Sequence, residues 1–183
     1  MKKNILQVLA LVNIIILFSC NKTTESVTEI SIDTVAVAVD SISQPANNSW
    51  EYNQSIDKMT SKPTKFAHLI SNESLDLEFP YDGANYGQLT LRKKDGLDIY
   101  LRIDKGQITG GYDNNIITIR FDKERPIKFS YSEPQDGSSN IIFINNESKF
   151  LSKLKKSKKI LISLPLYHEG NQILEFNTVD LKW

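Results

Sequence analysis

Residues 89–103 read LTLRKKDGLDIYLRI, and this stretch decides the fold. Apolar side chains occupy every second position of 97–103, which places them on one face of a strand and the polar side chains on the other. The preceding run, 89–92, alternates in the same way. Between the two runs lies Asp95-Gly96, a pair that is typical of tight hairpins. The stretch therefore predicts two antiparallel strands, each buried on one face.

Further strands are predicted on both sides of this hairpin. Alternating or continuous apolar runs, bounded by Gly, Pro and Asn, occur at 66–70, 115–121, 127–131, 141–144, 160–164 and 173–176. One short helix is expected where Phe150, Leu151 and Leu154 share a face, with Asn146 as its candidate cap. Strands at short intervals with one helix indicate an all-β fold, either an antiparallel β-sandwich or a partly open barrel.

The N-terminus has the layout of a lipoprotein signal peptide. Two lysines at positions 2 and 3 precede an apolar run over 5–17, which ends in Leu17-Phe18-Ser19-Cys20. This tetrad resembles a bacterial lipobox, whose thiol receives a diacylglyceryl group and whose mature chain carries acyl chains such as palmitate. The run is too short and too interrupted for a membrane span, whereas an ordinary cleaved signal remains an alternative. We expect residues 1–19 to be the signal peptide and Cys20 to be lipidated.

The remaining chain is expected to form a tether and one domain. Residues 20–49 are the expected lipidated cysteine and flexible tether, because 21–49 are rich in polar residues and lack aromatic ones. Partial alternation over 27–39 leaves open a strand or a segment that lies against the domain. Residues 50–183 have the size and composition of a single β-rich domain. The chain has 22 basic and 22 acidic side chains, so no net field attracts nucleic acid.

Catalytic motifs are sparse. The chain has one cysteine and two histidines, His68 and His168, and no spacing among them matches a zinc site. It contains neither a nucleophile elbow nor a phosphate-binding loop. Asp113-Asn114-Asn115 resembles the start of a calcium loop, but the glycine and the closing glutamate that such a loop needs are missing. The sequence therefore predicts no catalytic residue, no metal and no cofactor.

A candidate binding face follows from strand parity. Its members are Arg92, Tyr100, Arg102 and Arg120. Each has the polar parity of its predicted strand, so the four side chains should project away from the core on neighbouring strands. Guanidinium groups bind carboxylates and phosphates in a bidentate way, which suits anion or partner recognition. The alternative is a solvated sheet whose arginines pair with aspartates of the same parity, namely Asp98, Asp104 and Asp122.

The predicted helix is rich in lysine. Lysines occupy most positions of 153–159 outside the apolar face. They form either a basic surface for anionic lipid headgroups or an ordinary solvated helix face.

Short motifs in the domain resemble known exported proteins. They are Trp50, Asp57-Lys58-Met59-Thr60, Phe79-Pro80-Tyr81-Asp82-Gly83, Leu89-Thr90-Leu91-Arg92, Ile119-Arg120-Phe121-Asp122 and Glu175-Phe176. The pattern is similar to a group of bacterial exported domains and, more distantly, to the VasI/TagO family associated with type VI secretion. Lys93 stands where that family has cysteine, and Asp180 where it has glycine. The resemblance implies an accessory envelope protein with a β fold and provides no catalytic residue.

We therefore expect a membrane-tethered, non-catalytic binding or accessory module of the bacterial cell envelope, on its periplasmic or cell-surface side. Its partners would be the lipid bilayer, through the anchor at Cys20, and an envelope protein, with no role for nucleic acid. Two alternatives stay open. One is an envelope hydrolase that uses His68 or His168 with a carboxylate, and the other is an inhibitor or immunity-type protein.

Overall fold

The computed structural model of the 183-residue chain describes residues 48–110 and 115–183. The predicted signal peptide, Cys20 and nearly all of the predicted tether lie outside the described residues, as does Asp113-Asn114 of the calcium-like stretch. The chain divides into two units, Met1–Ala38 and Val39–Trp183. Every residue described below belongs to the second unit.

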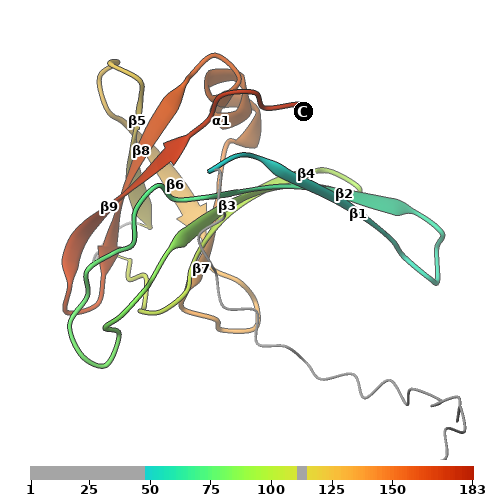
Figure 1. The fold of residues 1–183 in the computed structure, drawn as a ribbon. Helices are drawn as coiled ribbons and strands as arrows, with labels where there is room; N and C mark the ends of the chain where they lie inside the picture. Colours follow the sequence, from blue (N-terminus) through green and yellow to red (C-terminus); the bar gives the residue numbers. More distant parts are fainter. Residues whose placement is uncertain (1–47, 111–114) are drawn as a thin grey trace, which may run out of the picture. The chain divides into compact units, whose positions relative to one another are not determined.

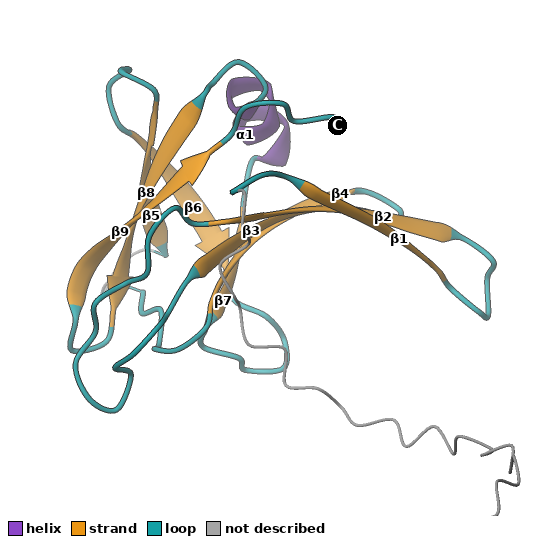
Figure 2. Cartoon of the chain, viewed as in Figure 1, coloured by secondary structure: helices purple, strands orange, loops and turns teal. Residues whose placement is uncertain are grey.

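The described residues form nine strands and one helix (Figures 1 and 2). In chain order they are β1 (Glu51–Ile56), β2 (Pro63–Ile70), β3 (Gly87–Lys93), β4 (Leu97–Ile103), β5 (Ile116–Phe121), β6 (Ile127–Ser132), β7 (Ile141–Ile144), α1 (Glu147–Leu154), β8 (Lys159–Leu166) and β9 (Gly170–Asn177). Neighbours in the sheet run β1-β2-β3-β4-β7-β6-β5-β8-β9, and all pairs are antiparallel. Because β1 and β9 stay at the two edges, the sheet is not closed. The predicted all-β sandwich or partly open barrel with one short helix is confirmed.

The hairpin that decides the fold forms with the expected parity. Lys93 of β3 lies opposite Leu97 of β4, and residues 94–96 make the turn. Ile99, Leu101 and Ile103 are buried, whereas the residues between them remain partly exposed. The alternation of 97–103 therefore gives the core face of β4 directly.

The core is formed where the curled sheet packs on itself and on α1. Phe150 and Leu154 of α1 are buried, as the sequence predicts. The ring of Phe150 meets Phe121 and Phe129 edge-on, with centroids 5.8 Å away in each case. These three rings join β5, β6 and α1 into one apolar cluster.

The two ends of the sheet approach each other without forming a ladder. The amide of Asn72, just after β2, donates to the carbonyl of Glu175 on β9 at 2.8 Å. Trp50 Nε1 donates to the carbonyl of Thr178 at 3.4 Å. Gly87 at the start of β3 faces Leu174 of β9 so closely that a Cβ there would collide with the leucine side chain. A glycine is therefore required where the two ends meet.

Two local features differ from the predictions. Strand β1 was not predicted, because its sequence EYNQSI shows no apolar alternation and all its residues are exposed. Asn146 occupies the predicted N-cap position of α1, but its backbone is left-handed (φ 64°, ψ 52°) and its side chain makes no capping hydrogen bond. Asparagine tolerates this conformation better than most residues, which explains its place before α1. Within the described ranges, no helix is long and apolar enough to span a bilayer.

Candidate functional site

Three of the four residues of the predicted face lie together on the outer side of the sheet. The register aligns His68 of β2, Thr90 of β3, Tyr100 of β4 and Phe143 of β7 in one row across four strands. A second row places Phe66, Arg92 and Asp98 opposite one another, and Arg102 follows Tyr100 on the same side of β4. We call this set the arginine–aromatic face: Phe66, His68, Thr90, Arg92, Asp98, Tyr100, Arg102 and Phe143.

Arg92 is at the centre of the arginine–aromatic face. Its Nε donates to Asp98 Oδ2 at 2.9 Å, and its Cζ lies 5.7 Å from the ring centroid of Tyr100 and 5.9 Å from that of Phe143. The two rings are themselves 5.5 Å apart. The side chains of Arg92 and Asp98 are 36% and 40% exposed, so their ion pair adds only about 0–1 kcal/mol to stability. The expected pairing with an aspartate is present, and it leaves a cation over two aromatic rings at the surface.

A polar chain runs beside this cation. His68 Nδ1 and Thr90 Oγ1 are hydrogen-bonded at 2.9 Å, and the ring of His68 stacks on Phe66. Burial lowers the pKa of His68, and the positive charge of Arg102 lowers it further, whereas Glu51 opposes the shift. Burial raises the pKa of Tyr100, whereas a hydrogen bond with Thr90 lowers it by a smaller amount. The neutral forms of both side chains are therefore favoured, and the row is held by neutral hydrogen bonds.

Arg120 is not brought to this face. It lies on β5, which β7 and β6 separate from β4 in the sheet. Its cross-strand neighbour is Leu161 of β8, and it lines a shallow cleft of about 150 Å³ with Leu161 and Ile173. Asp122, expected beside it on the strand, lies just past β5 with φ 47° and accepts hydrogen bonds from the amides of Lys158 and Lys159. The predicted neighbourhood of Arg120 is therefore wrong.

The lysines of the helical region are partly engaged within the fold. Lys153 pairs with Glu124 at 2.7 Å, and Lys159 pairs with Glu175 at 3.0 Å. The Nζ of Lys149 lies 5.4 Å from the ring centroid of Phe129. The helix is therefore not a uniform basic surface, and only some of its lysines face open solvent.

A second concave site was not predicted. A groove of about 380 Å³ lies between α1, the C-terminal segment and the ends of β2, β3 and β4. We call it the lysine groove; it is lined by Lys65, Lys93, Leu97, Leu151, Lys155, Lys182 and Trp183. The available signal was parity: Lys65 and Lys93 occupy the core-facing positions of their strands, where an apolar residue is expected.

The described residues offer little for catalysis. Neither histidine lines the lysine groove or the cleft beside Arg120. His68 Nδ1 is bonded to a hydroxyl group rather than to a carboxylate, and His168 is exposed on the loop between β8 and β9. In the part of the chain with described coordinates, no cluster of three or more His, Cys, Asp or Glu side chains is arranged to hold a metal ion.

Comparisons with models of known families, with curated proteins and with solved structures found no match for this chain. The likeness to the VasI/TagO family remains an expectation from the sequence.

Proposed function

We propose that this protein is a membrane-tethered, non-catalytic binding module of the bacterial cell envelope that recognises a protein partner through the arginine–aromatic face. The observation that carries the proposal is the position of Arg92 over Tyr100 and Phe143, with its side chain 36% exposed. Arginine and tyrosine, with tryptophan, are enriched among the residues that dominate binding energy in protein interfaces. The anchor at Cys20 lies outside the described residues and enters as part of this proposal.

The shape of the face favours a protein over a small molecule. The residues lie in register on four adjacent strands, so they form an extended, ordered patch across the sheet, which suits a protein partner better than a small molecule. The fully buried hydroxyl-bearing Thr90 and the stacked Phe66–His68 pair fix the side chains around Arg92. A patch ordered in advance loses little side-chain entropy on binding.

A binding role also fits the polar row better than the hydrolase alternative. A general base needs a pKa near the working pH and access to substrate. Burial lowers the pKa of His68, and its Nδ1 is bonded to Thr90. His68 is therefore better suited to holding neighbouring side chains of the sheet in place than to acting as a general base.

The test is a paired measurement on Arg92→Ala and on the matched control Arg120→Ala, which removes the same side chain from β5. Partners are captured from crosslinked envelopes with the full-length protein as bait, and the melting temperature of each variant is measured. Arg92→Ala should lower recovery of the partner strongly, since loss of an interface arginine often costs about 2 kcal/mol or more. Its stability should change by less than about 1 kcal/mol because the ion pair is exposed.

The control should retain capture. Equal recovery by both variants would show that the arginine–aromatic face is a solvated sheet surface. Equal loss by both would show that capture depends on general positive charge.

A further inference from the structure

We propose that the lysine groove is a binding site for a single anionic phospholipid, whose phosphate lies among the lysines and whose first methylenes lie on the apolar floor. None of the residues that line this groove belongs to the arginine–aromatic face, and the proposal does not depend on the function proposed for that face.

The lining has the two parts that such a ligand requires. Leu97, Leu151 and Trp183 are partly buried and pack against the hydrophobic core, so they form an apolar floor. Four lysines surround this floor, and none of the described residues that line the groove is acidic. A volume of about 380 Å³ is within the range of small-molecule sites. Lysine acts as a point charge for phosphate, and tryptophan suits the boundary between polar and apolar groups.

The two lysines from the sheet lie where they repel each other. Lys65 of β2 is directly opposite Lys93 of β3 in the ladder. Like charges directly opposite each other destabilise a sheet, and both positions have the parity of the core. An anion between the two ammonium groups would remove this repulsion. The arrangement therefore has a cost in the free protein that a bound phosphate would offset.

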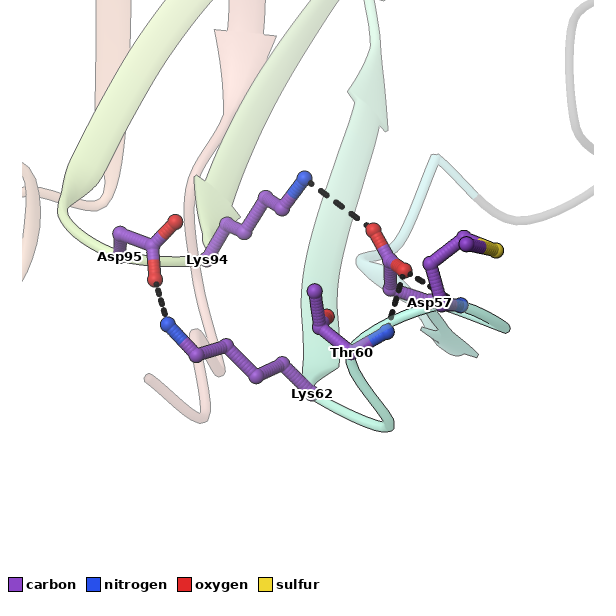
Figure 3. A network of polar contacts seen from close by, with 6 residues as sticks. Asp57, Thr60, Lys62, Lys94 and Asp95 are labelled. Carbon is purple, nitrogen blue, oxygen red and sulfur yellow. Dashed lines mark hydrogen bonds and ion pairs between the residues drawn. The ribbon is translucent and has the colours of Figure 1, made fainter.

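The acidic side chains at the tips of the two hairpins do not neutralise the groove. Figure 3 shows Lys62 reaching Asp95 and Lys94 reaching Asp57, at 2.9 Å and 3.6 Å. Asp57 also accepts hydrogen bonds from the amides of Met59 and Thr60. These contacts hold the turn of β1–β2 against the turn of β3–β4. They also engage both carboxylates with lysines outside the groove. In the described part of the chain, no ion pair includes Lys65, Lys93, Lys155 or Lys182.

The groove selects an amphiphile over a simple anion. Inorganic phosphate would satisfy the lysines and leave the indole of Trp183 and the leucines in contact with water. A phospholipid also covers these apolar atoms, and burial of apolar surface adds to affinity. A flat anionic membrane would instead attract each exposed lysine according to its distance from the membrane surface, with no preference for the lysines in the groove.

The experiment uses a soluble form that starts at Asn21 and so keeps every described residue. Dihexanoyl phosphatidylglycerol, below the concentration at which it forms micelles, is titrated into the protein while tryptophan fluorescence is recorded. Trp50 is buried and does not line the groove, so a fluorescence change that requires Trp183 reports the groove. We expect a saturable change that Trp183→Phe abolishes.

Two double variants remove equal charge. Lys93→Gln with Lys155→Gln changes the groove, whereas Lys156→Gln with Lys158→Gln removes two exposed lysines outside it and leaves the groove lining and the Lys94–Asp57 pair intact. The first variant should weaken lipid binding about tenfold or more, since each lysine near an anionic lipid raises the binding affinity roughly fivefold. The second should stay within about threefold of the unchanged protein.

Four results would overturn the proposal. The first is a complete lack of saturable binding, and the second is an equal loss of affinity in the two double variants. The third is binding of glycerol phosphate or of dihexanoyl phosphatidylcholine with the same affinity as dihexanoyl phosphatidylglycerol, because the site would then not be selective for an anionic amphiphile. The fourth is binding to vesicles with phosphatidylglycerol but not to the monomeric lipid, which would assign the lysines to a flat membrane-facing surface.

Discussion

Lys65→Glu is expected to stabilise the protein, although it removes a residue from the lysine groove. The change replaces the lysine–lysine pair of β2 and β3 with an opposite-charge pair, because Lys93 lies directly across the ladder. Cross-strand charge pairs contribute roughly 0.2–1 kcal/mol, with the sign set by the charges. Both positions are exposed, so solvent screening limits the net gain to about 0.5–1 kcal/mol. For a domain of this size the melting temperature should rise by about 2–4 °C.

The assay is thermal unfolding at about 20 mM and about 1 M sodium chloride. Salt shortens the range of electrostatic interactions to about 3 Å at the higher concentration, so the gain should largely disappear there. Lys62→Glu is the control, because Lys62 pairs with Asp95 at 2.9 Å and the same substitution then creates repulsion. The two variants should shift the melting temperature in opposite directions at low salt. A fall in stability for Lys65→Glu, or a gain that persists at high salt, would refute the charge-repulsion argument.

Two further predictions test the core and the polar row. Phe150→Ala should lower the free energy of unfolding by about 3–5 kcal/mol, because it removes a fully buried ring that packs against Phe121 and Phe129. Urea denaturation measures this loss, and a loss below about 1.5 kcal/mol would contradict the packing of α1. Burial lowers the pKa of His68 from 6.5, so the unfolded chain binds this proton more readily and stability should fall as pH drops from about 6.5 towards the folded pKa. His68→Gln should remove that part of the pH dependence, and an unchanged slope between about pH 7.5 and 5.5 would show that His68 is not desolvated.

The local geometry of the sheet was predictable because each strand carries its own parity. The alternation of 97–103 identified which side chains of β4 enter the core, and the same alternation placed Arg92, Tyr100 and Arg102 on one face. These predictions required only the pleat of a strand and one hairpin.

Relations between distant strands were not predictable in this way. Arg120 has the expected outward parity, but β7 and β6 lie between β5 and β4, so the order of strands in the sheet differs from the order in the chain. Strand β1 was missed for another reason. It is an exposed edge strand that β2 holds through backbone hydrogen bonds, and such a strand needs no apolar pattern.

The lysine groove combines both difficulties. Its residues come from β2, the β3–β4 hairpin, α1 and the C-terminal segment, which only the tertiary fold brings together. The local signal was a lysine at a core-facing position, and such lysines also occur where a strand extends past the core. Parity correctly placed Lys65 and Lys93 on the core-facing side of β2 and β3. The curvature of the sheet determines whether a side chain on that side packs in the core or lines a groove.

The two proposed sites lie on opposite sides of the same strands. Phe66 follows Lys65 and Lys93 follows Arg92, so one step along β2 or β3 passes from one site to the other. Phe66 adjoins the groove, since it lines a neighbouring depression with Lys65, Lys182 and Trp183, whereas Arg92 has the opposite parity to the groove lysines of β2 and β3. Substitutions of Arg92 and of the groove lysines should therefore act independently. If both proposals hold, a phospholipid in the groove would turn the arginine–aromatic face away from that lipid and towards a partner. Capture of the partner should then survive loss of the groove lysines, and lipid binding should survive loss of Arg92.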